Sequence, residues 1–265
     1  MNKIIIAFCE GQDDIAFLSE ILSVHEFKPY KKIIKDFIEP LNKQYMIKLQ
    51  NKEIADRKLG FQSEYMIPSV ALQNESANTL VLLHNLGGDQ KIEERNDILS
   101  MYQNIQSGED DFTNYNLNFR FLYFFDADDK GISTRMDEIN EELELNDKLS
   151  HSEIKEIDSY EWGCYIFHKD KDSGDLEDII LDLMKPNNET IFNNSSSFLT
   201  DNALDETRCR RFKEKKSIIS IAGQLQFSGV NNSVIISKSD YITCTDISDN
   251  EQCQEIIKLF QSKNE

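Results

Sequence analysis

The sequence predicts an α/β protein in which helices flank a parallel sheet, with one insertion and a helical C-terminal extension. Three observations lead to this prediction. Four short apolar runs have the length of buried strands, helical patterns follow the first three, and glycines stand where strands give way to loops. Strands buried on both faces of a parallel sheet read as continuous apolar runs. Strands that alternate with helices imply right-handed crossovers, and therefore parallel pairing.

The third apolar run, Phe121 to Phe125, is expected to be a central strand. Asp126, Asp128 and Asp129 follow it, at the position where an α/β sheet presents ligand-binding groups. If the backbone stays extended, Asp126 and Asp128 leave the strand on the same side. Two such carboxylates repel each other unless a cation lies between them, and a hard divalent ion is the natural candidate. The alternative is an Asp-rich turn that caps the next helix.

The first apolar run, Lys3 to Phe8, precedes a glycine turn and a helical pattern from Ile15 to Leu22. Glu10 and Asp14 stand four residues apart across that turn, so both are expected at the open end of the sheet. The alternative is an ordinary acid in the first turn of a helix, stabilised by the helix dipole. We favour that alternative for Asp13 but not for Glu10.

The other two strands are expected at residues 79–86 and 162–168. The pair Gly87-Gly88 ends the first of them, and glycines allow a ligand to approach the backbone closely. His84, within that strand, is expected to be a satisfied structural histidine rather than a ligand.

An acidic segment follows the last of these strands. Ser173 is the expected N-cap of its helix, with Asp175, Glu177 and Asp178 in the first turn, where acids are favoured in any case. If the strands are neighbours, Glu177 or Asp178 comes to lie beside Glu10 and Asp126.

Two stretches interrupt the strand–helix alternation. Residues about 27–78 are interpreted as an insertion, with a lysine-flanked helical pattern that Pro40 is expected to end. Residues 187–202 have the composition of a linker. The chain is therefore divided into an α/β domain at 1–185 and an extension at 186–265 that packs on it.

One dense basic patch stands out in a chain whose formal net charge is −19. An acidic protein that contacts nucleic acid must do so locally, through a metal, or with a partner, because phosphate neutralisation supplies most of the affinity. An exposed helix face and a phosphate contact explain the patch equally well. Its six cations are Arg208, Arg210, Arg211, Lys213, Lys215 and Lys216.

Composition argues against several classes of protein. The five cysteines are odd in number and contain no Cys-x-x-Cys pair, which disfavours both a disulfide framework and a zinc site. No apolar stretch reaches the length of a membrane span, and the N-terminus does not have the pattern of a signal peptide. A cytoplasmic protein without a membrane partner is expected.

Over residues 1 to about 185, the ordered motifs resemble a Toprim domain. That family has a Glu after its first strand, often a Gly pair after the second, Asp-x-Asp after the third, and later acids. The matching residues are Glu10-Gly11 with Asp14, Gly87-Gly88, Asp126-Ala127-Asp128, and Ser173 to Asp178. The chain is similar to the stand-alone Toprim-like proteins related to the OLD (overcoming lysogenization defect) nucleases. Its basic patch and residues 216–226 more loosely resemble their C-terminal extension.

The resemblance implies a Toprim-like (Rossmann-like) fold and Mg²⁺- or Mn²⁺-dependent phosphoryl transfer on nucleic acid, DNA rather than RNA, with two ions. It implies Glu10 and Lys216 as catalytic groups. The implied metal ligands are Glu10, Asp14, Asp126, Asp128 and Glu177, with Asp175 or Asp178 completing the set. The cations expected to contact nucleic acid are Arg208, Arg210, Arg211, Lys213 and Lys215.

Two other functions are kept as alternatives. The sequence departs from the OLD pattern by its long insertion and by the lack of an ATPase domain, and it has no active-site tyrosine context of a topoisomerase. A non-catalytic or regulatory partner of an ATPase or a nucleic-acid-processing complex is therefore one alternative. A haloacid-dehalogenase-like phosphatase is the other, because Phe124 to Asp128 resembles the aspartyl nucleophile motif of that family. In that family, however, the motif usually opens the domain.

Overall fold

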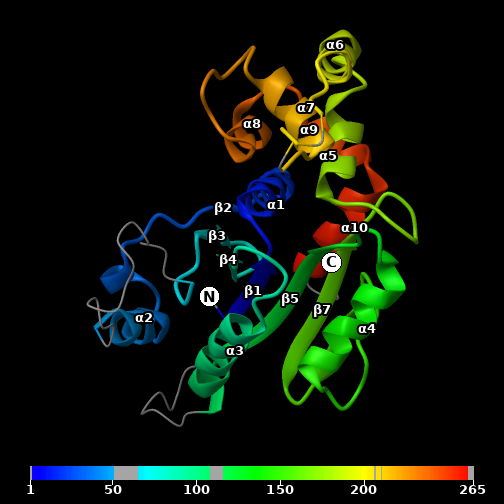
Figure 1. Cartoon of the computed structure of the whole chain (residues 1–265). Helices are drawn as coiled ribbons and strands as arrows, with labels where there is room; N and C mark the ends of the chain where they lie inside the picture. The colour runs from blue at the N-terminus through cyan, green and yellow to red at the C-terminus, as the bar shows by residue number, and fades with distance from the viewer. Residues whose placement is uncertain (1, 51–64, 108–115, 206, 210, 262–265) are drawn as a thin grey trace.

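A computed structural model describes residues 2–50, 65–107, 116–205, 207–209 and 211–261 of the chain. In these residues it shows a mixed α/β fold around a seven-stranded, mostly parallel sheet of order β2-β3-β4-β1-β5-β7-β6 (Figure 1). The four predicted strands form its parallel centre: β4 (Thr79–Asn85), β1 (Lys3–Cys9), β5 (Asn118–Asp126) and β7 (Tyr160–Phe167). The predicted α/β class is therefore confirmed.

Antiparallel strands extend both edges of this parallel centre. β2 (Lys28–Pro29) and β3 (Val70–Asn74) come from the insertion and lie beside β4, whereas β6 (Ile154–Ile157) pairs with β7. The sequence analysis did not predict these short edge strands, which lack long apolar runs.

The expected helix before Pro40 was a wrong prediction. Before Pro40 the insertion forms only one helical turn, the 3-10 helix η1 (Ile34–Asp36), and Pro40 directly precedes helix α2 (Leu41–Gln50). Proline suits the start of a helix as well as its end, because the first helical N–H groups have no partner within the helix.

The remaining helices cover the two faces of the sheet (Figure 1). Their bounds are α1 (Gln12–Val24), α3 (Ile92–Ser107), α4 (Gly131–Leu143), α5 (Leu176–Met184), α6 (Glu189–Asp201), α7 (Glu214–Gly223), α8 (Asn232–Lys238), α9 (Cys244–Asp249) and α10 (Glu251–Phe260). Helix α6 replaces the predicted linker. Its Phe192 is fully buried, and burying that ring stabilises a helix that its Asn and Ser residues favour only weakly.

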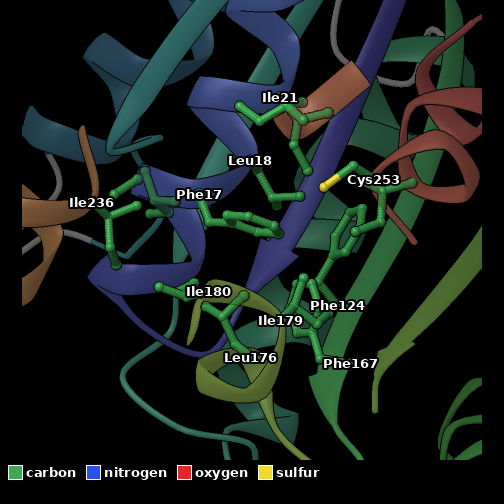
Figure 2. Packing of buried hydrophobic residues seen from close by; sticks show 14 of the residues in the cluster. Phe17, Leu18, Ile21, Phe124, Phe167, Leu176, Ile179, Ile180, Ile236 and Cys253 are labelled. Carbon is green, nitrogen blue, oxygen red and sulfur yellow. The ribbon is translucent and has the colours of Figure 1, made fainter. Parts of the chain in front are cut away.

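Successive side chains of β5 enter two separate hydrophobic cores. Leu122 and Phe124 pack with α1, α5 and the helices of the C-terminal extension, whereas Phe121 and Phe125 pack with α2, α3 and α4. Figure 2 shows the first core, in which Phe124 lies among residues of α1, α5, α8 and α10. The extension therefore shares a core with the sheet, and its helices cover one face.

A fully buried arginine on β5 ties the sheet to the end of the extension. The Arg120 guanidinium donates to Glu161 Oε2 at 2.7 Å, to the Gln261 carbonyl at 2.8 Å and to the Leu259 carbonyl. Lys3 also reaches the Glu161 carboxylate, at 3.2 Å. One guanidinium thus supplies donors to the last turn of α10, where helix carbonyls have no partner within the helix.

His84 belongs to a buried chain of hydrogen bonds that joins the insertion to β4. Its Nδ1 lies 3.0 Å from the Tyr65 carbonyl, its Nε2 lies 2.9 Å from the Tyr102 hydroxyl, and that hydroxyl lies 2.7 Å from Tyr45 Oη. Burial lowers the pKa of His84 to about 4, so the ring is neutral. Because a carbonyl only accepts, Nδ1 carries the proton and Nε2 accepts from Tyr102, which in turn accepts from Tyr45. The predicted structural role of His84 is confirmed.

Replacing Tyr102 by phenylalanine should reduce the free energy of unfolding by about 1–3 kcal/mol, because His84 Nε2 and the Tyr45 hydroxyl both lose their buried partner. Urea denaturation would measure the change. Tyr160→Phe is the matched control, since its hydroxyl makes one long bond of 3.4 Å to the Gln103 carbonyl. Equal losses in the two variants would show that the buried chain adds nothing to stability.

All five cysteines are free thiols, and Cys9, Cys164 and Cys253 are buried. Burial raises the pKa of the Cys9 thiol well above its ordinary value, which keeps it protonated. No helix among the described residues has both the length and the apolar character needed to cross a bilayer.

Candidate functional site

Glu10 and Asp126 meet at the carboxyl edge of the sheet. β1 and β5 are parallel neighbours, with Cys9 opposite Phe124, so the residues that follow them emerge together. Glu10 Oε1 accepts a hydrogen bond from the Asp126 backbone N–H at 3.1 Å. The prediction that these two acids gather at one edge is confirmed. Burial is the main cause that raises the pKa of Glu10 above its ordinary value.

Asp14 joins this edge from the first turn of α1. Its side chain is only 7 % exposed, and Oδ2 accepts from the Gly11 N–H at 3.0 Å. Burial, followed by the charge of Glu10, raises the pKa of Asp14 to about 7. An acid in the first turn of a helix is favoured by the dipole, but here the loss of hydration outweighs that effect.

Asp126 is the most strongly perturbed of these carboxyl groups. Its Oδ1 accepts from the Leu176 N–H at 2.8 Å, which joins the end of β5 to the start of α5. Burial raises the pKa of Asp126 to about 9, and the negative charges of Glu10, Asp14 and Glu177 contribute further. Asp126 therefore keeps its proton at neutral pH in the ion-free protein.

Glu177 completes what we call the carboxyl cluster, which consists of Glu10, Asp14, Asp126 and Glu177. Its side chain is 4 % exposed and comes from the first turn of α5. Burial raises the pKa of Glu177, although the Lys216 ammonium, 2.8 Å from its Oε1, opposes this. The cluster thus brings together acids that are up to 167 positions apart in the sequence, from Glu10 to Glu177.

Two consecutive lysines of α7 face the acids of this edge. Lys216 Nζ also lies 3.5 Å from Asp13, and its carboxylate neighbours raise its pKa despite the opposing effect of burial. Lys215 Nζ lies 2.9 Å from Asp175 Oδ1 and also pairs with Asp178. Lys216 therefore lies at the cluster as predicted. Lys215, which was predicted to contact nucleic acid, is instead engaged in ion pairs within the chain.

Asp175 and Asp178 form a capping box rather than part of the cluster. Asp175 Oδ1 accepts from the Asp178 N–H, and Asp178 Oδ2 accepts from the Asp175 N–H, both at 3.1 Å. The N-cap is therefore Asp175, and the prediction of Ser173 was wrong by two residues. Capping and the ion pairs with Lys215 already account for these carboxylates.

Asp128 does not leave the strand alongside Asp126, which corrects the prediction from their spacing. Its φ of 50° is left-handed, so the backbone is no longer extended at this residue. Asp128 and Gly174 exchange two backbone hydrogen bonds, with N···O distances of 2.7 and 3.0 Å. The Asp128 carboxylate instead pairs with Arg135 Nη2 of α4, at 2.6 Å.

Arg135 is a buried organiser of the same edge that sequence reasoning missed. It donates to the Asp126 carbonyl at 2.8 Å and to Asp89 Oδ2 at 2.8 Å, besides its bond to Asp128. Asp89 directly follows the glycine pair, so its position was a usable signal. Arg135 lies in a helical pattern without any motif and gave none.

A cavity of about 400 Å³, lined in part by Arg135, lies between α3 and α4. Arg95 lines it too, bound to Glu142 through two hydrogen bonds and placed over the Phe125 ring at 5.1 Å. Carboxylates already surround both guanidinium groups, so the cavity offers little free positive charge.

The other predicted cations lie on the segment that leads into α7. Arg208, Arg211 and Lys213 are exposed, and within the described ranges none of them forms an ion pair. Arg210 lies outside the described residues.

No group of three or more His, Cys, Asp or Glu side chains is arranged to hold a metal ion in the part of the chain that the structure describes. Hydrogen bonds account for this: Glu10, Asp14 and Asp126 accept from backbone N–H groups, and Glu177 is paired with Lys216. The four side chains offer carboxylate oxygens, which are the metal ligands that Mg²⁺ and Mn²⁺ prefer. Their chemistry fits such an ion once the side chains rotate toward one another.

Comparison with known proteins gives a family but no activity. A family model described as "Protein of unknown function (DUF3226)" matches residues 5–262, so the chain belongs to that family. Neither the curated proteins nor the solved structures contain a match to the chain.

Proposed function

We propose that this member of the DUF3226 family catalyses divalent-metal-dependent phosphoryl transfer on nucleic acid, as a nuclease resembling the Toprim and OLD enzymes. The observation that carries the proposal is the carboxyl cluster at the open edge of the sheet. Buried acids that raise one another's pKa are costly to maintain, and such groups are concentrated at functional sites. A lysine beside them adds the positive charge that phosphoryl transfer needs.

The cluster suits a hard divalent cation, either Mg²⁺ or Mn²⁺. Glu10 and Asp126 would hold it together with Asp14 and Glu177, and the set has enough oxygens for two ions. Bound ions of this kind activate water and stabilise the leaving oxygen of a phosphodiester. Among the described residues, two cations act on these carboxyl groups: Lys216 pairs with Glu177, and the charge of Arg135 partly opposes the effect of burial on the pKa of Glu10.

Two side chains are assigned chemical roles of their own. Glu10, whose pKa is raised by burial, is the group assigned to take and return a proton. Lys216 keeps its charge because its pKa is raised, and it can donate to a phosphate oxygen once Glu177 turns toward a cation.

The test is cleavage of plasmid DNA and of labelled DNA and RNA oligonucleotides with Mg²⁺ or Mn²⁺, compared with EDTA. Asp126→Ala should lower the rate at least about 100-fold, as expected for loss of a group that acts directly in the reaction. Asp182→Ala is the control, because Asp182 is exposed on the same helix as Glu177. Equal rates in the wild type and Asp126→Ala, or full activity in EDTA, would contradict the proposal.

A non-catalytic role in a complex is the second candidate. Lys215 and Lys216 form ion pairs with Asp175, Asp178 and Glu177. Such pairs would stabilise the acids of a site that no longer binds a metal ion. This function predicts no cleavage under any ion condition, together with copurification of an ATPase or another nucleic-acid-processing protein. Isolation of the chain as a lone monomer would count against it.

A further inference from the structure

The six cations of the basic patch divide into two structural groups. Lys215 and Lys216 belong to α7, and their ammonium groups are engaged by the carboxylates at the sheet edge. Arg208, Arg211 and Lys213 precede the helix, are exposed, and have no carboxylate partner in the described residues. A protein with a net charge of −19 has many acids available for pairing. Three neighbouring cations that none of the described acids engages therefore form a local anion-attracting surface.

An exposed aromatic ring lies within this group. Phe212 stands between Arg211 and Lys213, and 52 % of its surface is accessible. Most other phenylalanines of the chain are buried in the two cores. Cations that flank an accessible aromatic ring are the arrangement with which proteins bind a single strand, by phosphate contacts and base stacking.

The exposed group lies close along the chain to Lys216, the lysine that pairs with Glu177 of the carboxyl cluster. Lys213 is the N-cap of α7, and Lys216 follows it by three residues, within the first turn of that helix. One helical turn advances about 5 Å, so the two residues are separated by only a few ångströms along the helix axis. A strand held at Lys213 thus has its next phosphates within reach of Lys216 and Glu177.

We propose that residues 207–209 and 211–213, which we call the docking segment, bind single-stranded nucleic acid. Arg208, Arg211 and Lys213 contact successive phosphates, and Phe212 stacks on one base. The inference rests on the proposed function for what happens to the strand, but the docking itself requires neither a metal nor catalysis. The proposed substrate class is therefore unpaired strands rather than duplexes.

The preference for single strands follows from the ring. In a duplex, base faces are covered by neighbouring base pairs, so Phe212 would meet only the sugar-phosphate surface. A duplex would also bring its high charge density close to a protein whose net charge is −19. An acidic polypeptide would satisfy the cations but would leave the ring without a stacking partner.

The experiment measures fluorescence anisotropy of labelled dT20, the dT20·dA20 duplex and polyglutamate with the full chain in EDTA. We expect dT20 to bind with a Kd of about 10 µM at low salt, at least about ten-fold tighter than the other two probes. Three phosphate contacts to a single strand predict a log–log salt slope of about −2. Equal affinity for the three probes, or no binding of dT20, would overturn the inference.

Substitutions separate stacking from charge. Phe212→Ala should weaken dT20 binding about ten-fold without changing the salt slope, and Phe212→Trp should restore it. Arg211→Ala should reduce the slope by about 0.7. The matched controls are Phe198→Ala, which removes an exposed ring of α6, and Lys48→Ala, which removes an exposed cation of α2. If either control weakens binding as much as its counterpart, the assignment to the docking segment is wrong.

The outcomes distinguish this inference from the proposed function. Because binding is measured in EDTA, dT20 affinity that depends on Phe212 supports docking even if no cleavage is ever observed. Cleavage that proceeds equally well in Phe212→Ala and Arg211→Ala, on single strands and duplexes alike, would overturn docking and leave the nuclease proposal standing.

Discussion

Arg120→Met is expected to lower the free energy of unfolding by about 3–5 kcal/mol, the usual cost of removing one partner from a buried, hydrogen-bonded charge pair. The side chain is fully buried on β5 and donates to the carbonyls of Leu259 and Gln261. Methionine fills a similar volume but offers no donor, so these carbonyls would stay unsatisfied. Glu161 would keep only its bond to Lys3.

The same substitution should loosen the C-terminus before the rest of the chain unfolds. Urea denaturation would give the loss of stability, and limited proteolysis would show earlier cleavage near α10. Lys155→Met is the matched control, because it removes a cation that pairs with the largely exposed Asp147, and such pairs contribute less than about 1 kcal/mol. If both variants lose the same amount, Arg120 does not anchor the extension.

Arg120 also illustrates what sequence reasoning could not supply. The apolar run from Phe121 marks β5 as buried, which the structure bears out. The partners that satisfy the arginine at its start lie 41 and about 140 positions further along the chain. No local pattern indicates such partners, so a charge at the beginning of a buried strand could not be assigned a role.

In the candidate site, too, some residues could be placed from the sequence and others could not. Glu10 and Asp126 were predictable because both follow strands, and parallel strands end at one edge. The position of the Asp128 side chain was not predictable, because the backbone of Asp128 pairs with Gly174, which belongs to a loop from another part of the chain. An extended backbone was the simplest assumption for Asp-x-Asp, and a left-handed residue breaks it. Short motifs thus locate the edge of a sheet more securely than they orient each side chain.

The helices of the extension show a further limit. Asn- and Ser-rich residues at 187–202 indicated a linker, yet they form α6 around the buried Phe192. The buried Ser195 hydroxyl donates to the Ile191 carbonyl at 2.9 Å, which satisfies a polar group inside the protein but does not itself favour the helix. Composition describes what a segment prefers alone, whereas a helix next to a core is stabilised by its apolar contacts.

Asp126→Asn is expected to make the ion-free protein more stable at pH 8, on the order of 2 kcal/mol, because it removes a buried group that resists ionisation. Asparagine keeps an oxygen that can accept from the Leu176 N–H, so the link between β5 and α5 is retained. Few substitutions at a site are stabilising, which makes the sign of this change informative.

The effect should grow with pH in a defined window. In the folded protein the pKa of Asp126 is about 9, compared with an ordinary value of 3.8. Between these values the folded state retains a proton that the unfolded state releases, so wild-type stability falls as pH rises from about 4 to about 9. Asp14, with a pKa of about 7, adds to this fall over the lower part of the window. The variant lacks the Asp126 contribution and should show a shallower decline.

Urea denaturation at pH 5 and pH 8, with and without 10 mM MgCl₂, would test both the charge and the cation. Mg²⁺ should stabilise the wild type at pH 8 by about 2.7 kcal/mol if the ion is present at 100 times its Kd, and Asp126→Asn much less. Asp128→Asn is the control: its carboxylate is held by Arg135, so its loss should destabilise the protein at both pH values. If Mg²⁺ stabilises wild type and Asp126→Asn equally, the cation binds elsewhere, and the carboxyl cluster is a strained structural feature rather than a metal centre.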